Sequence, residues 1–308
     1  MAQAITGSRS LRVHEGEKGS PHTPVLLSET LRWLDPRPGG VYVDATVGSG
    51  GHAEAILERI GPSGLLIGLD RDPEAIAFAQ DRLARFGEAV RLVRANFATL
   101  RATLQGLGVA RVDGVLMDLG VSSLQLARPE RGFSFSLTGP LDMRMDPAIP
   151  TTAADLVNRL PEHALAEILA RYGEEPFARR IAREIVRSRP LRTTEELREA
   201  VARAVPRRAW PRRIDVATRT FQALRIAVNQ ELEALEQALP QAVDVLVPGG
   251  RLVVIAFHSL EDRIVKQFLR RTERVRILTP KPVRPSPEEV RQNPRARSAR
   301  LRAAEKLP

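Results

Sequence analysis

The chain has 308 residues and no cysteine, which excludes disulfides, a thiolate nucleophile and sulfur-ligated zinc. With 43% hydrophobic and 27% charged residues, its composition suits one large globular domain or two modest ones. The formal net charge is +10, and residues 263–308 account for all of it, with 14 Lys or Arg against 4 Asp or Glu. This imbalance fits either a C-terminal region that faces nucleic acid or a solvated basic tail.

The N-terminus and the hydropathy pattern bear on location. Residues 1–20 are polar, predict a flexible leader and lack the apolar run of a secretory signal. No stretch approaches the roughly 18 consecutive apolar residues that a membrane span needs. We therefore expect a cytoplasmic protein without a membrane partner.

From Pro24 onward, predicted strands alternate with predicted helices. This alternation is typical of an α/β fold in which a Rossmann-like parallel sheet carries helices on both faces. The predicted strands are 41–44, 65–70, 90–93 and 114–118, and the helices between them are 53–60, 73–86 and 98–107.

The alternation stops after Leu126, where a loop runs to Pro150 and a helical pattern follows. We predict a discontinuous α/β domain, 21–126 and 218–308, interrupted by an all-helical domain at 127–217 that recognises the substrate beside the carboxyl ends of the strands. The later predicted elements are helices at 161–172 and 174–187, a helix opening at the capping box Thr193–Glu196, a long helix at 218–239 and a strand at 251–257.

A glycine-rich segment follows the first predicted strand. Asp44-Ala-Thr-Val-Gly-Ser-Gly-Gly-His52 joins that strand to a helix, and its glycines permit a tight turn and close approach of a ligand to the backbone. Gly48, Gly50 and Ala53 satisfy the relaxed dinucleotide pattern G-x-G-x-x-G/A. Alone, the segment fits a plain strand-to-helix turn as well.

Polar and aromatic residues end the next three predicted strands. Asp70 ends the second strand, where a carboxylate can accept hydrogen bonds from both hydroxyls of a ribose. Phe97 follows the third strand, where its ring can face an adenine, and Asp118 ends the fourth. Because the carboxyl ends of parallel strands meet at one edge, these residues predict an adenosine-binding crevice. S-adenosylmethionine and NAD fit it almost equally well.

Several longer segments together form a family pattern. They are His22–Leu26, Asp44–His52, Asp70–Pro73, Asp118–Ser123, Arg131–Phe135, Gly139–Asp146, Arg219–Asn229, Phe257–Asp262 and Arg297–Arg302. Over about residues 21–308 the chain resembles the bacterial ribosomal RNA small-subunit methyltransferase H family, formerly called MraW. The resemblance implies a class I methyltransferase sheet and an S-adenosyl-L-methionine-dependent enzyme. It further implies methylation of N4 of a cytidine in the decoding (P-site) region of 16S rRNA.

The resemblance also implies a set of cofactor contacts. Carried over residue by residue, they fall on Gly50, Gly51, His52, Asp70, Phe97, Asp118 and Gln125. His52 and Gln125 rest on the resemblance alone, whereas the strand-end argument selects the glycine segment and the other three independently. Leu124 departs from the pattern, since relatives often carry proline before this glutamine.

Asp118 is the predicted catalytic residue, placed between the cofactor and the target amine. Other amino-methyltransferases carry an Asp/Asn-Pro-Pro-aromatic motif at this strand end, but this chain has Asp118-Leu-Gly-Val121. The carboxylate is kept and the stacking ring is absent. Phe133 and Phe135, in the following loop, are candidates to replace that ring, and the alternative is that they anchor the insertion.

The implied partner is 16S rRNA, within the small ribosomal subunit or its precursor. Basic residues of the insertion and of the C-terminal segment are expected to bind its phosphates. The candidates are Arg144, Arg219, His258, Arg295 and Arg297, with Arg300 and Arg302 nearby. The 5 histidines are scattered and form no H-E-x-x-H motif, so no metal site is expected.

Two other functions stay open. An NAD-dependent dehydrogenase would use the glycine pattern and Asp70, although it leaves the basic C-terminus unexplained. A non-catalytic RNA-binding ribosome assembly factor would carry a vestigial cofactor site. The sequence does not determine the oligomeric state, a homodimer included.

Overall fold

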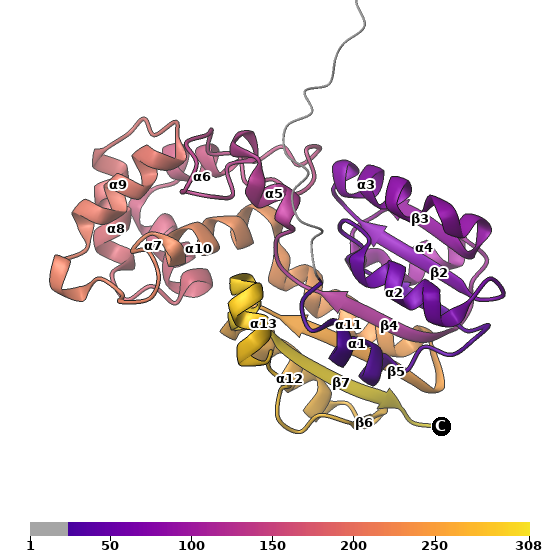
Figure 1. Ribbon diagram of the computed structural model, residues 1–308. Helices are drawn as coiled ribbons and strands as arrows, with labels where there is room; N and C mark the ends of the chain where they lie inside the picture. Colours follow the sequence, from indigo (N-terminus) through magenta and orange to yellow (C-terminus); the bar gives the residue numbers. More distant parts are fainter. Residues whose placement is uncertain (1–23) are drawn as a thin grey trace, which may run out of the picture.

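The structure, a computed structural model, describes residues 24–308 and contains a seven-stranded sheet with helices around it (Figure 1). The predicted leader, 1–20, lies outside the described residues, as do His22 and Thr23. The strands lie in the order β3-β2-β1-β4-β5-β7-β6. They are β1 (Val41–Asp44), β2 (Leu65–Asp70), β3 (Val90–Arg94), β4 (Val112–Asp118), β5 (Leu246–Ala256), β6 (Val275–Ile277) and β7 (Arg300–Lys306).

Strands β1 to β5 pair in parallel, which confirms the predicted parallel sheet, whereas β7 runs antiparallel to both β5 and β6. β6 and β7 are absent from the sequence prediction, which treats the C-terminal segment as a basic surface. In the structure Leu301, Ala303 and Ala304 are fully buried, and Arg302 is only 6% exposed. The end of the chain is therefore an interior strand rather than a tail.

The helices cover both faces of the sheet, which confirms the α/β fold class. Successive strand residues point to opposite faces, so that Val43 and Leu252 join one apolar core while Tyr42 and Val253 join the other. The first core is completed by α4 (Leu100–Gly106), α11 (Glu231–Val245) and α12 (Ser259–Arg271), and the second by α1 (Leu27–Leu34), α2 (Gly51–Ile60) and α3 (Pro73–Leu83). The short α13 (Pro287–Gln292) precedes β7.

A third apolar core unites the helices that interrupt the α/β order, which confirms an all-helical insertion. We call α6 to α10 the helical lobe; Figure 1 shows it beside the sheet. After the short α5 (Ser123–Ala127), its members are α6 (Ala153–Arg159), α7 (Glu162–Gly173), α8 (Ala178–Arg187), α9 (Thr194–Ala204) and α10 (Thr218–Asn229). The division of the chain at 127 and 217 stays a prediction, and Phe221 and Leu224 of α10 pack in the lobe core.

The single helix predicted at 218–239 is wrong, because the chain breaks between α10 and α11. Gln230, between them, adopts a left-handed conformation with φ 50°. Leu224 of α10 is buried in the lobe core, whereas Leu235 and Leu239 of α11 are buried against the sheet. One straight helix cannot bury its apolar residues in both cores. The bend at Gln230 lets α10 pack in the lobe core and α11 pack against the sheet. Among residues 24–308, no helix is long and apolar enough to cross a membrane.

Candidate active site

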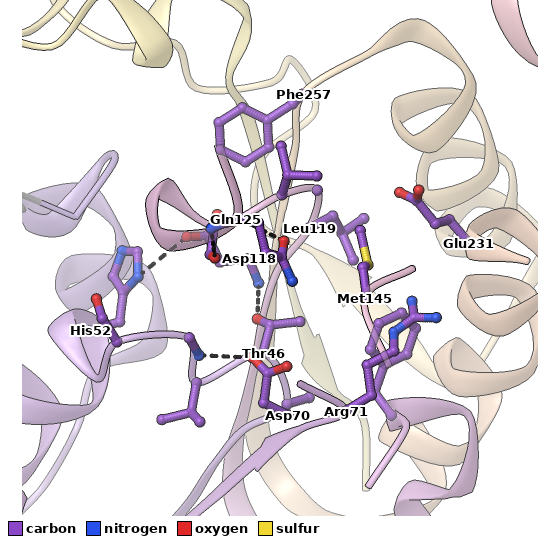
Figure 2. A pocket seen from close by; sticks show the side chains of 18 of the residues that line it. Thr46, His52, Asp70, Arg71, Asp118, Leu119, Gln125, Met145, Glu231 and Phe257 are labelled. Carbon is purple, nitrogen blue, oxygen red and sulfur yellow. Dashed lines mark hydrogen bonds and ion pairs between the residues drawn. The ribbon is translucent and has the colours of Figure 1, made fainter. Parts of the chain in front are cut away.

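A pocket opens at the carboxyl ends of β1, β2 and β4, and Met145 and the start of α11 line it as well (Figure 2). Asp70, Phe97 and Asp118, predicted from separate strand ends, all line it. Parallel strands bring these side chains together because their carboxyl ends share one edge of the sheet. Gly51, His52 and Gln125 also line the pocket, as do Glu231 of α11 and Phe257 after β5.

The glycine segment shapes the floor of the pocket through its backbone. Gly48 (φ 51°) and Gly50 (φ 83°) are both left-handed, a conformation that glycine adopts without steric cost. A Cβ at Gly51 would lie 2.6 Å from Cγ of Pro24, so a larger residue there would displace Pro24 from the start of α2. Gly48 lines the pocket directly, whereas Gly50 serves the turn that starts α2.

Asp70 is held rigidly at the end of β2. Its Oδ2 accepts a hydrogen bond of 3.0 Å from the Gly48 amide, and its Oδ1 accepts one of 2.9 Å from the Asp72 amide. Burial raises the pKa of Asp70, although these two amide donors act in the opposite direction. Each carboxylate oxygen has a second lone pair, so the group can still accept hydrogen bonds from a diol in the pocket.

Phe97 forms an apolar wall beside Asp70. It lies in the 3-10 turn Phe97–Thr99 that leads into α4, and it is 8% exposed. The guanidinium of Arg71 lies 5.9 Å from its ring centroid and donates a 2.8 Å hydrogen bond to the Asn229 carbonyl. A flat heterocycle can therefore pack in the pocket against a ring that Arg71 already contacts.

Asp118 lies at the end of β4 and lines the pocket. Its amide donates a 2.6 Å hydrogen bond to Oγ1 of Thr46, which fixes the backbone. Its Oδ1 is enclosed and has no hydrogen-bond partner within the described chain. Burial raises the pKa of Asp118 well above its usual range, and the neighbouring carboxylates of Asp44 and Glu261 raise it further. An enclosed acceptor of this kind fits a ligand that donates a hydrogen bond.

His52 lies against the other oxygen of Asp118. Its Nδ1 is 3.5 Å from Asp118 Oδ2, and its Nε2 is 3.0 Å from the Val25 carbonyl oxygen. A carbonyl oxygen only accepts, so Nε2 carries a proton and Nδ1 is the atom that faces Asp118. The pair can thus hold a shared proton beside the pocket.

Gln125 lines the pocket with both ends of its amide already engaged. Its Oε1 accepts a 3.0 Å hydrogen bond from the Ser122 amide, and its Nε2 donates a 2.8 Å hydrogen bond to Oδ2 of Asp72. The side chain is 4% exposed. Gln125 therefore ties the start of α5 to the start of α3, which fixes the wall of the pocket.

Phe257, which the sequence argument did not select, also lines the pocket, on the side of Asp118 away from Asp70 (Figure 2). Phe133 and Phe135 lie in the lobe core instead, and Phe135 packs edge-on against Phe221 with centroids 5.1 Å apart. Of the two alternatives for these residues, the structure supports anchoring of the insertion. The available signal for Phe257 was its position as the last residue of the predicted strand at 251–257.

The predicted RNA-contacting residues are not brought together. Arg295 reaches the pocket and contacts the Ser123 hydroxyl, whereas Arg219 and Arg297 are exposed elsewhere. Arg144 binds Asp142 at 2.8 Å and the carbonyls of two loop residues at 2.9 Å. His258 caps α12 and lies 3.2 Å from Glu261.

The expectation that Arg302 binds phosphate is wrong. Arg302 lies in β7, and its Nε donates a 2.7 Å hydrogen bond to Oδ1 of Asp262. Arg300 binds the other oxygen of the same carboxylate at 3.1 Å. Asp262, on α12, thus binds both arginines of β7 and offsets one of their two charges, and this pairing across 40 residues has no local sequence signal. Within residues 24–308, no cluster of three or more His, Asp or Glu is placed to hold a metal ion.

Comparison with known proteins identifies the family. The model of the MraW methylase family matches residues 19–307. Ribosomal RNA small subunit methyltransferase H of Geobacter sulfurreducens is 55% identical over 307 residues, covering 93% of this chain and 99% of that protein. The protein of the same name from Thermomicrobium roseum is 52% identical over 314 residues, covering 95% and 96%. Among solved structures, the chain is similar to a putative rRNA methylase from Clostridium thermocellum, with a TM-score of 0.45 and 14% identity over 91% of this chain and 95% of that one.

These matches decide between the two cofactors that the crevice fits almost equally well. A methylase uses S-adenosylmethionine, and the dehydrogenase alternative has no support among the family and its relatives. The chain belongs to the MraW methylase family and is an S-adenosylmethionine-dependent methyltransferase.

Proposed function

We propose that this methyltransferase modifies the exocyclic N4 amino group of a cytidine in the P-site region of 16S rRNA. Its relatives are named ribosomal RNA small subunit methyltransferase H, which supports an rRNA substrate. The resemblance of the motifs supports the N4 position. The observation that carries the chemistry is Asp118, whose enclosed Oδ1 lacks a partner in the described chain and therefore fits an amine donor.

The residues present fit the cofactor. The glycine segment lets a ligand approach the backbone, Asp70 offers two fixed carboxylate oxygens to a ribose diol, and Phe97 offers a ring face to an adenine. His52 and Gln125 would complete this side of the pocket, His52 beside Asp118 and Gln125 by holding the α5 wall. When bound, S-adenosylmethionine supplies an electrophilic methyl group on a sulfonium.

Asp118 would orient the amine and accept its proton. Cytosine N4 is a poor nucleophile because its lone pair is delocalised into the ring. A hydrogen bond from the amino group to Asp118 Oδ1 would turn the lone pair toward the methyl group. The methyl–sulfur bond would break as the N–C bond forms, with its electron pair staying on sulfur. The nitrogen would lose one proton to the carboxylate of Asp118, whose other oxygen lies 3.5 Å from His52 Nδ1. Alignment of this kind supplies roughly 7–11 kcal/mol of the barrier.

Phe257 is the residue that we propose contacts the target base. Figure 2 shows Phe257 and Asp70 on opposite sides of Asp118, so a base near Phe257 would meet the cofactor across that carboxylate. A Cβ at Gly120 would lie 3.5 Å from the Phe257 ring, so glycine leaves the ring face open at this point. A base must leave its stack to enter, at a cost of a few kcal/mol that the RNA contacts have to supply.

The RNA contacts themselves are part of the proposal. Arg295 at the pocket mouth and the exposed Arg219 and Arg297 would meet phosphates directly. Arg144 binds the carbonyls of its own loop and would act by holding that loop in place. His258 caps α12 and would hold the start of that helix. The partner would be the small ribosomal subunit or its precursor, which places the enzyme in the cytoplasm, as a monomer or a homodimer.

The test is nucleoside mapping of the methylated product. The purified enzyme is given isotopically labelled S-adenosylmethionine and either naked 16S rRNA or small subunits from cells lacking the gene. We expect label in N4-methylated cytidine, and label on another base or another atom would overturn the proposal. In D118N we expect turnover to fall about 10²–10⁴-fold, with thermal stabilisation by S-adenosylhomocysteine retained. Full biological activity of D118N would instead support the non-catalytic assembly factor.

A further inference from the structure

The loop between α9 and α10 is the densest run of positive charge in the helical lobe. Residues 206–214 read Pro-Arg-Arg-Ala-Trp-Pro-Arg-Arg-Ile and contain no acidic residue. We call this segment the arginine loop; its arginines are Arg207, Arg208, Arg212 and Arg213, all exposed. It lies at the end of the lobe that is remote from the sheet (Figure 1).

The arginines of this loop lack acidic partners within the described chain, whereas several exposed arginines elsewhere in the fold have them. None of the four forms an ion pair with an acidic residue of the described chain, whereas Arg85, for example, binds Glu58 at 2.6 Å. The nearest acid in sequence, Asp215, is already held by Arg198 at 2.7 Å. Four like charges in close sequence repel one another, and an anionic partner would relieve that repulsion.

The loop is also braced. The Arg207 guanidinium lies 4.3 Å from the Trp210 ring centroid, and Trp210 Nε1 donates a 3.0 Å hydrogen bond to the Val205 carbonyl. Pro206 and Pro211 restrict φ on either side of the tryptophan. Trp210 itself packs against the lobe core. The charges are thus presented on a fixed backbone, which lowers the entropic cost of binding.

We propose that the arginine loop binds the phosphate backbone of the RNA substrate at a point remote from the catalytic pocket. This inference rests on the proposed function, because it takes the substrate to be RNA. Arginine favours phosphate over other anions, since its planar fork donates two parallel hydrogen bonds to phosphate oxygens. An acidic protein surface is the competing occupant, and the test below separates the two.

The position of the loop sets the length of RNA that it can contact. α10 runs 12 residues from the loop end to the junction with α11, beside the pocket, and this is about 18 Å at 1.5 Å per residue. At 3.4 Å per stacked base step, 18 Å corresponds to about five steps along a strand. A stacked RNA of three or four nucleotides around the target would therefore not reach the loop, whereas a long fragment would.

The test compares RNA affinity in two variants of equal net charge. The loop variant is R207Q/R208Q/R212Q/R213Q. The matched control is R37Q/R85Q/R159Q/R276Q, which removes four arginines whose side chains are 57% to 81% exposed and already ion-paired. The probes are a long 16S rRNA fragment and a four-nucleotide RNA. Binding is measured over a salt series, and S-adenosylhomocysteine stabilisation reports an intact fold.

We expect the loop variant to bind the long fragment at least about tenfold more weakly, and its slope of log affinity against log salt to be flatter by roughly 3, as expected for four lost phosphate contacts. The control and the short RNA should show no such change. Equal affinity and slope in the loop variant and the parent would overturn the proposal. So would equal losses in both variants, which would show a net-charge effect, or loss of binding to an acidic ribosomal protein with RNA binding unchanged.

The two proposals can fail separately. The loop is judged by binding, so a parent enzyme that binds the long RNA but methylates a different atom refutes the N4 assignment and leaves the loop result intact. A parent that methylates cytidine N4 while the loop variant binds normally refutes only the loop. A parent that binds no RNA refutes both.

Discussion

The side-chain oxygen of Asn229 accepts a 2.7 Å hydrogen bond from the Met145 amide. Its side-chain nitrogen donates a 2.7 Å hydrogen bond to the Met143 carbonyl, and its own carbonyl accepts a 2.8 Å hydrogen bond from Arg71. Asn229 is the last residue of α10 and is 2% exposed. The side-chain amide of Asn229 thus joins α10 to the loop that carries Met145 into the pocket, and its main-chain carbonyl joins α10 to Arg71 after β2.

Loss of this amide should affect both stability and the pocket. N229A leaves buried backbone donors and acceptors unpaired, at about 1–3 kcal/mol of unfolding free energy for each group. The matched control is N158A, because Asn158 also binds both backbone groups of one residue, Leu191, at 2.8 and 2.9 Å, but in the lobe. Urea unfolding should show similar losses for both variants. Only N229A should weaken S-adenosylhomocysteine binding, and equal cofactor affinity in the two variants would contradict this view.

The high pKa of Asp118 predicts a pH-dependent turnover. The group must be ionised to accept a proton, and burial together with Asp44 and Glu261 raises its pKa. Turnover at saturating substrate should therefore rise with pH and level off once Asp118 is ionised. A pH–rate profile checks this, with D113N as control, since Asp113 lies near the other end of β4 and binds the Val41 amide. D118N should remove the rising limb, and a variant profile that keeps it would assign the titration to another group.

Asp44 should make the protein less stable as pH rises. It is 1% exposed, and burial raises its pKa from 3.8 to about 7. A carboxyl with a raised pKa contributes stability that is fully present below the unfolded value and is lost as pH rises through the folded one. The full effect is about 4 kcal/mol at 1.36 kcal/mol per pKa unit. Urea unfolding at acidic and at neutral pH measures this. Between the two pH values, the free energy of unfolding should fall less in D44N than in the parent. An equal fall of the unfolding free energy in D44N and in the parent would mean that Asp44 does not cause it.

Phe257 and Phe97 should separate substrate binding from cofactor binding. If Phe257 stacks on the target base, F257A should lose about 1–3 kcal/mol of that interaction, seen as a reduction of about 5- to 150-fold in kcat/KM for RNA. Its S-adenosylhomocysteine affinity should stay unchanged. F97A should show the reverse pattern, with weaker S-adenosylhomocysteine binding. Isothermal titration measures S-adenosylhomocysteine affinity, and steady-state kinetics measures kcat/KM for RNA. If both variants lost cofactor affinity and kcat/KM alike, the two rings would not have separate roles.

The sequence alone was sufficient to place the ends of the parallel strands. The alternation of apolar runs and helices is local, and parallel strands necessarily meet at their carboxyl ends, so Asp70, Phe97 and Asp118 could be assigned to one crevice before any coordinates. The family motifs extended the same set to His52 and Gln125. What these patterns report is the order and type of elements.

Only the tertiary structure decided which distant residues pair. Gln125 binds Asp72 across 53 residues, Asn229 binds Met145 across 84, and Arg302 of β7 binds Asp262 of α12 across 40. The break at Gln230 is of the same kind, because it depends on which core each half of the predicted helix enters. Hydrophobic periodicity specifies which face of an element is buried but not what covers it. The partner of a buried polar group is set by the packing of the whole chain, which no short window of sequence contains.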